Sequence, residues 1–321
     1  MRQYHQWQAT TLPPMNTSAL AESSTIKPLK PLKGVRIVSL ALNLPGPAAL
    51  MRCQQMGASC VKLEPLPHPS APKGTPGDPM GLYNRRAYDE LHHQVRIAQA
   101  DLKTDKGQKA LHRELAKADV LLTSFRPSAL TKLGLEWKAL HKRYPQLSCV
   151  AIVGAPGARS EEPGHDLTYL AESHLITGLD LPPTLYADMG GSLMASEAVL
   201  QARLQQLTVG KGVRLEVSLS YAAAYLALPR LWDLTTQGAA VGGGHAGYKV
   251  YPCKDGRVAL AALEPHFAAS LAAAVGLPSS NIMAMFSPAT HHAIAAYLLS
   301  QTRAQLNALA VNKDIPLHTL P

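Results

Sequence analysis

A strand, a turn, a helix and a second strand follow one another early in the chain, and this order restricts the fold more than any other feature. Residues 33–40 are short, rich in β-branched side chains and bounded by Gly and Pro, which predicts a buried strand. The Leu-Pro-Gly-Pro run at 44–47 predicts a turn. Residues 48–56 predict a helix that ends at Gly57, and residues 59–64 predict the next strand. Strands joined in this way run parallel, so an α/β fold with a parallel sheet is expected.

The pattern continues to about residue 155, where a loop-rich stretch begins that extends to Asp188. The later predicted strands are 98–102, 119–124, 147–153 and 213–219, the helices are 106–118, 127–133, 190–207 and 221–236, and a β-hairpin with an Asp-Gly turn joins 248–251 to 257–263. We therefore expect a flexible tail over residues 1–32, a large Rossmann-like domain over 33–225 and a smaller α+β domain over 226–321.

Composition and charge exclude several classes of protein. No apolar run reaches the roughly 18 residues of a membrane span, and the polar N-terminus lacks the apolar segment of a secretory signal, so we expect a cytoplasmic protein. The four cysteines show no metal-ligand spacing, which predicts reduced thiols and no metal site. The net charge of +9 favours an anionic partner. The basic residues are scattered and not interleaved with aromatic ones, which argues against nucleic acid.

Three residues in Gly- or Pro-flanked segments form the candidate catalytic set, namely His165, Asp188 and Glu264. A His and a carboxyl group on opposite sides of a substrate carbon can remove a proton from one face and return it on the other. His165 suits this task because the pKa of imidazole is near neutrality. Asp188 would have to be protonated to donate, which a buried apolar setting favours. The alternatives are a structural loop histidine, a cap for a helix that begins near Gly190, and a simple helix start at Glu264.

Short blocks in a fixed order resemble the family III CoA-transferases, the CaiB/BaiF superfamily. These blocks are Pro31 to Val38, Gly46-Pro47, Gly57 to Pro65, Asp101-Leu102-Lys103, Ala118-Asp119-Val120, Phe125-Arg126-Pro127, Leu133-Gly134-Leu135 and Gly210-Lys211-Gly212. Within the family, Gly-His-Asp at 164–166, Asp188 before Gly190-Gly191, and Glu264-Pro265-His266-Phe267 resemble the α-methylacyl-CoA racemase branch.

The resemblance implies an interlocked homodimer that acts on acyl-CoA thioesters and needs no cofactor beyond the CoA of its substrate. In the racemase branch the residues that match His165 and Asp188 exchange the α-proton, and the one that matches Glu264 supports the His. In the transferase branch the Asp is a nucleophile that forms an acyl anhydride, and the His-Asp pair is generally absent. Asp166 is interpreted as a cap or an orienting partner for His165.

Six residues are predicted to contact CoA. They are Leu44 and Pro45 in the first βα turn, Lys62 and Arg126 at strand ends, Phe125 facing the adenine, and Tyr169 lining the thioester pocket. For Lys62 and Arg126 the alternative is a solvated charge. Gly190 and Gly191 are expected to offer backbone N–H groups to the enolate oxygen, since they would begin a helix.

Two segments depart from the family pattern. Leu91 to Val95 stand where an Asn-Arg-Gly-Lys motif is usual, and family members run past the position of Pro321, so the smaller domain is expected to be shortened. The leading hypothesis is a racemase or epimerase of 2-methylacyl-CoA thioesters that uses His165 and Asp188. The alternatives are a CoA-transferase with Asp188 as nucleophile, and a non-catalytic CoA-binding relative.

Overall fold

The computed structural model describes residues 29–278 and 282–321, and the chain forms two compact units. The first unit comprises the chain up to Asp166 together with Leu185–Ala222, and the second comprises Leu167–Thr184 together with Ala223–Pro321. The chain therefore leaves the first unit once between His165 and Asp188, and again after Ala222. The sequence-based division at residue 225 did not anticipate the first of these crossings.

The packed fold begins before residue 33. Most of the predicted tail, residues 1–28, lies outside the described residues. Leu32, the last residue assigned to that tail, is fully buried, and its N–H donates to the carbonyl of Met56 at 3.0 Å. Leu32 therefore belongs to the core of the first unit.

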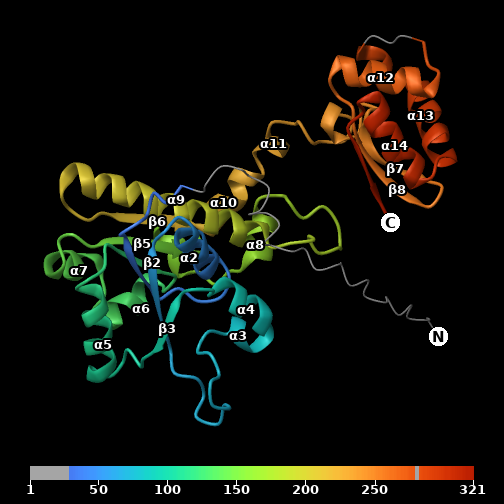
Figure 1. The fold of residues 1–321 in the computed structure, drawn as a ribbon. Coiled ribbons are helices and arrows are strands. Elements are labelled where there is room, and N and C mark those ends of the chain that lie inside the picture. The colour runs from blue at the N-terminus through green and yellow to red at the C-terminus, as the bar shows by residue number, and fades with distance from the viewer. Residues whose placement is uncertain (1–28, 279–281) are drawn as a thin grey trace. The chain divides into compact units, whose positions relative to one another are not determined.

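A six-stranded parallel sheet forms the centre of the first unit (Figure 1). Its strands are β1 (Arg36–Ser39), β2 (Ser59–Glu64), β3 (Arg96–Gln99), β4 (Val120–Thr123), β5 (Ser148–Val153) and β6 (Arg214–Ser218). Their order is β3-β2-β1-β4-β5-β6, and β1 pairs on one side with β2 and on the other with β4. This order is that of the Rossmann fold and confirms the predicted parallel sheet.

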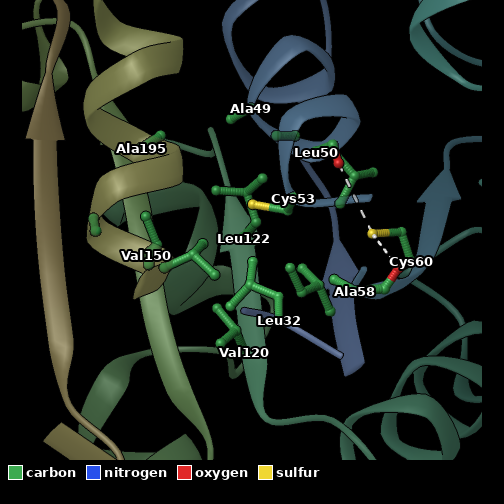
Figure 2. Packing of buried hydrophobic residues seen from close by; sticks show 14 of the residues in the cluster. Leu32, Ala49, Leu50, Cys53, Ala58, Cys60, Val120, Leu122, Val150 and Ala195 are labelled. Atoms are coloured by element: carbon green, nitrogen blue, oxygen red, sulfur yellow. Dashed lines mark hydrogen bonds between the residues drawn. The ribbon is translucent and has the colours of Figure 1, made fainter. Parts of the chain in front are cut away.

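Helices cover both faces of the sheet, as the apolar character of both faces of the strands requires. The helices of this part of the chain are α2 (Pro45–Gln55), α3 (Met80–Tyr83), α4 (Arg85–Leu91), α5 (Asp105–Leu115), α6 (Pro127–Lys132), α7 (Trp137–Arg143), α8 (Asp166–Glu172), α9 (Tyr186–Val209) and α10 (Leu219–Leu226), with a 3₁₀ turn at Gly157–Glu161. Successive strand residues point to opposite faces, so Leu122 packs with α2 and α9 whereas Leu121 packs with α5 and α7. Figure 2 shows the first of these cores, with Cys53 of α2 and Ala195 of α9 beside Leu122 and Val150.

The second unit contains a three-stranded antiparallel sheet of β7 (Tyr248–Cys253), β8 (Gly256–Ala261) and β9 (Leu317–Leu320). Its helices are α11 (Leu228–Leu231), α12 (Pro265–Val275), α13 (Pro288–Ser300) and α14 (Arg303–Lys313), with 3₁₀ turns at Ala240–Gly242 and Ile282–Phe286. The hairpin predicted around Asp255-Gly256 is confirmed, because Cys253 pairs with Gly256. The strand β9 was not predicted, and the helix expected over 221–236 is instead the end of α10 followed by α11.

None of the described helices combines the length and the apolar character that crossing a membrane requires.

Candidate active site

The strand order reverses between β1 and β4, and the loops that follow these two strands lie next to each other. The N–H of Leu40 donates to the carbonyl of Leu122 at 2.8 Å, and the N–H of Leu42 donates to Oγ of Ser124 at 3.1 Å. In open α/β sheets the crevice beyond the carboxyl ends of the strands at such a reversal binds ligands. The first unit therefore has a candidate ligand site at this point.

Four of the six predicted CoA contacts lie at this reversal. Leu44 is half-buried before the first turn of α2, and Pro45 is buried as the first residue of that helix. Phe125 packs against the core on the α5 side, and Arg126 is exposed directly before α6. The structure thus brings together residues about eighty positions apart, and their contact with CoA remains a prediction.

The turn between β1 and α2 leaves no room for a side chain at residue 46. A Cβ placed on Gly46 would lie 2.2 Å from the Cβ of Ala41. We expect Gly46→Ala to lower the free energy of unfolding by roughly 1–3 kcal/mol, as overpacking does in other tight sites. Urea unfolding of Gly46→Ala, Ala41→Gly and the double variant checks this. The double variant should recover most of the loss, and simple additivity of the two single effects would contradict the clash.

His165, Asp166 and Asp188 come together where α8 and α9 begin. Asp166, buried at the start of α8, accepts the backbone N–H of Asp188 through Oδ1 at 3.0 Å, a contact that spans 22 residues. Asp188 is half-buried in the first turn of α9, and His165 is exposed next to Asp166. Asp166 therefore caps α9, a helix that begins twenty residues further along the chain, which agrees with its interpretation as a cap.

The environment of Asp188 favours its protonated form. Burial, and then the nearby carboxylate of Asp166, raise the pKa of Asp188 to about 6, while the charge of His165 acts in the opposite direction. Both forms of this carboxyl group are therefore accessible near neutral pH. Tyr83 is the last residue of α3. Burial, and then the negative charges of Asp78 and Asp188, raise the pKa of its phenol, so this phenol interacts electrostatically with Asp188. Sequence reasoning missed Tyr83, since nothing in its local sequence marks it.

The prediction that Gly190 and Gly191 donate their backbone N–H groups to the enolate oxygen is wrong. Helix α9 begins at Tyr186, four residues before Gly190, so Gly190 and Gly191 lie in its second turn. Only the first four N–H groups of a helix lack a partner in the helix, and the one on Asp188 is taken by Asp166. Gly191 has a packing role instead, because a Cβ there would lie 2.3 Å from Cδ2 of Leu219.

Lys62 is not at a solvent-facing strand end. Its side chain is fully buried in β2, and its ammonium pairs with Asp78, lies 3.2 Å from Oε1 of Glu64 and lies 2.8 Å from Nε2 of His92. These contacts use all three ammonium protons. The predicted CoA contact of Lys62 is therefore corrected to a structural ion pair, and its alternative, a solvated charge, is wrong as well.

The cluster around Lys62 has the composition of a metal site but holds its own cation. Ligand atoms of Glu64, Asp78 and His92 lie within 4.8 Å of one another, which is the single such group among residues 29–278 and 282–321. Nδ1 of His92 lies 2.6 Å from the carbonyl of Tyr88, which leaves Nε2 to accept from Lys62. The ammonium of Lys62 thus occupies the position that a metal ion would take.

The same cluster holds the first βα turn in place. Oδ1 of Asp78 accepts the N–H groups of Asn43 at 3.1 Å and Met80 at 2.9 Å. Asn43 has a left-handed backbone (φ 63°), so the turn that leads to Leu44 has an unusual conformation. His92, one of the residues in the altered Asn-Arg segment, therefore supports this turn through Lys62 and Asp78.

Two predicted site residues belong to the second unit. Tyr169 is buried in α8, and Glu264 is exposed directly before α12 without capping that helix through its side chain. His165 belongs to the first unit, so the contact predicted between Glu264 and His165 stays a prediction. The role of Tyr169 beside the thioester likewise stays a prediction.

A six-stranded parallel sheet in the Rossmann order, whose strand order reverses between β1 and β4, places the chain among α/β folds. Comparison with known proteins identifies the family. CoA-transferase family III matches residues 32–320. The chain belongs to CoA-transferase family III. It resembles crystal structures of a hypothetical protein from Mycobacterium tuberculosis (TM-score 0.74, 21% identity, 91% of this chain and 85% of that one) and of a CaiB/BaiF family protein from Brucella suis (TM-score 0.71, 20% identity, 92% and 85%).

Curated relatives fall into both branches of the family. The chain is 31% identical over 277 residues to α-methylacyl-CoA racemase of Mus musculus, covering 80% of this chain and 68% of the relative. It is 30% identical over 210 residues to cinnamoyl-CoA:phenyllactate CoA-transferase of Clostridium sporogenes, covering 60% of this chain and 50% of the relative. The chain thus spans from half to about two thirds of the length of these two relatives.

Proposed function

We propose that this protein acts on acyl-CoA thioesters and interconverts the epimers of a 2-methylacyl-CoA. The observation that carries the proposal is the pairing of His165 with a carboxyl group, Asp188, whose pKa is raised to about 6. A carboxyl group that is accessible in both its protonated and its ionised form can act as acid in one direction and as base in the other, which a reversible inversion at carbon requires. The likeness to α-methylacyl-CoA racemase supports this choice.

In the proposed reaction the CoA moiety occupies the crevice between the loops after β1 and β4. The neutral imidazole of His165 removes the α-proton from one face, and the protonated carboxyl of Asp188 returns a proton to the other. The thioester carbonyl itself delocalises the negative charge, so no further cofactor takes part. The N–H groups of Tyr186 and Ala187, at the start of α9, replace Gly190 and Gly191 as candidate donors to the enolate oxygen. Glu264 orients His165, Tyr169 lines the acyl pocket, and two chains form the functional dimer.

The experiment that tests the proposal follows the α-proton. Each pure epimer of a 2-methylacyl-CoA is incubated with the protein in deuterium oxide. We expect deuterium at the α-carbon and a mixture of epimers from either starting compound. Unchanged substrate, with CoA binding shown separately, would favour the non-catalytic alternative.

Asp166 should set the acidity of Asp188. Asp166→Asn keeps an oxygen that accepts the N–H of Asp188 but removes the charge that raises the pKa of Asp188. The direction of reaction in which Asp188 donates should then lose rate at a lower pH than in the unmodified protein, because the donor form is lost earlier as the pH rises. The pH dependence of kcat/KM in both directions checks this. A shift to higher pH would contradict the assigned role.

A CoA-transferase is the second candidate, because one relative is a CoA-transferase and Asp188 is a partly accessible carboxylate near neutral pH. In that reaction Asp188 attacks the thioester carbonyl and releases CoA as the acyl anhydride forms. Hydroxylamine added during turnover would convert this anhydride to a hydroxamate at Asp188, detectable by peptide mass spectrometry. The racemase proposal expects no modification there.

A further inference from the structure

A groove on the first unit lies between α5 and the end of α7, on the outer side of the helix layer and away from the residues of the candidate active site. Its volume is about 630 Å³, which is within the usual range for small-molecule sites. The side chains that define it are Asp105, Lys109, His112 and Arg113 of α5, Arg143 of α7 and the following Tyr144. The α5 residues recur at helical spacing, so one face of the helix supplies them.

The groove has an excess of positive charge. Lys109, Arg113 and Arg143 are exposed, and in the part of the chain that the structure describes no carboxylate pairs with any of the three. The second acidic residue of α5, Glu114, faces away and is held by Arg36 at 2.6 Å and Arg96 at 2.8 Å. Asp105 is thus the single acid among the lining residues.

Aromatic contacts hold one of these cations in place. The guanidinium carbon of Arg143 lies 5.4 Å from the centre of the Tyr144 ring, a cation–π contact. The hydroxyl of Tyr144 lies 3.0 Å from Nδ1 of His112, a residue of α5. The rings of these two residues form the floor of the groove. Arg143 is also exposed, so its N–H groups remain accessible to a ligand. Burial, and then the charge of Arg143, lower the pKa of His112, so the three longer side chains carry the charge.

We propose that this groove binds a pyrophosphate group, either as the free anion or within a nucleotide. Arg113 and Arg143 offer planar pairs of N–H donors that match phosphate oxygens, and Lys109 adds a point charge. A pyrophosphate is small enough for the groove and carries enough negative charge to offset three cations. A nucleotide would in addition stack its base on the exposed part of the His112–Tyr144 floor. This site is separate from the proposed acyl-CoA site and does not depend on it.

Isothermal titration of the full chain with inorganic pyrophosphate tests the proposal. We expect saturable binding at one site that weakens as ionic strength rises. Lys109→Ala and Arg143→Ala should each raise the Kd at least tenfold. Lys138→Ala removes an exposed lysine of α7 that does not line the groove, and it should change the Kd less than twofold. Unchanged Kd in both groove variants, with folding verified by circular dichroism, would overturn the proposal.

Two further measurements distinguish a nucleotide from the free anion, and this groove from the proposed CoA crevice. ADP should bind more tightly than pyrophosphate if a nucleotide is the natural ligand, and no more tightly if the free anion is. Arg126→Ala changes the crevice between β1 and β4, where the CoA moiety is proposed to bind. Pyrophosphate binding that is lost in Arg126→Ala and kept in Arg143→Ala would place the anion in that crevice and contradict a second site.

Discussion

Asp188→Asn is expected to slow the interconversion of the two epimers of a 2-methylacyl-CoA by roughly 10²–10⁴-fold, the usual contribution of a general acid or base. The amide keeps the shape of the carboxyl group and the helical position but carries no transferable proton. Chromatographic separation of the two epimers over time gives the rate of inversion. Glu197→Gln is the matched control, since Glu197 is an exposed acid further along α9 that contacts Gln201. That variant should keep the full rate.

His165→Gln removes the other proposed base and tests whether each base serves one epimer. With a single remaining base, one epimer should still exchange its proton through Asp188 but without inversion, and the other should not exchange. Asp188→Asn should show the reverse preference. His93→Gln, which changes another exposed histidine, is the control and should behave as the unmodified protein. Inversion at full rate in both His165→Gln and Asp188→Asn would exclude the two-base mechanism. Loss of acyl transfer in Asp188→Asn alone would favour the transferase.

Lys62→Met is expected to lower the free energy of unfolding by about 3–5 kcal/mol, because it leaves buried carboxyl groups without their cation. Methionine fills a similar volume, so lost packing contributes little. The side chains of Lys62, Glu64 and Asp78 are all fully shielded from solvent, which is why the effect should be large. Urea unfolding monitored by circular dichroism measures it.

Lys138→Met is the control for this substitution, because the same change at an exposed lysine of α7 should alter stability by less than about 0.5 kcal/mol. The result that contradicts a structural role for Lys62 is unchanged stability together with weakened CoA binding. That result would support the predicted contact between Lys62 and CoA.

The parallel sheet could be predicted because its signal is local. The strands β1, β2, β4 and β5 are short apolar runs that end at turns, and both of their faces are covered by helices. The strand β9 was missed because Leu317–Leu320 is an edge strand of four residues near the end of the chain, and its pairing with β8 is long-range. The start of α9 was misplaced because Gly190-Gly191 has the composition of a helix boundary, whereas tight packing on Leu219 explains Gly191.

The candidate site was predictable where family-like motifs mark it and not where tertiary contacts create it. The meeting of the loops before α2 and α6 follows from the strand order of a Rossmann-like domain, the kind of domain that the sequence predicted. The burial of Lys62 depends on Asp78, which stands in a Pro- and Gly-rich loop with no periodic pattern. The cap that Asp166 provides for α9 joins residues 22 positions apart, and no local rule indicates it.

The excursion, namely the segment Leu167–Thr184 that belongs to the second unit, determines how the two units could be produced separately. A single cut after Ala222 cannot yield two self-contained halves, because the N-terminal piece would retain a segment whose packing partners it has lost. Both ends of that segment adjoin the hydrogen bond between Asp166 and Asp188. Shortening the excursion should therefore pull directly on the backbone of Asp188 and change the alignment of its carboxyl group.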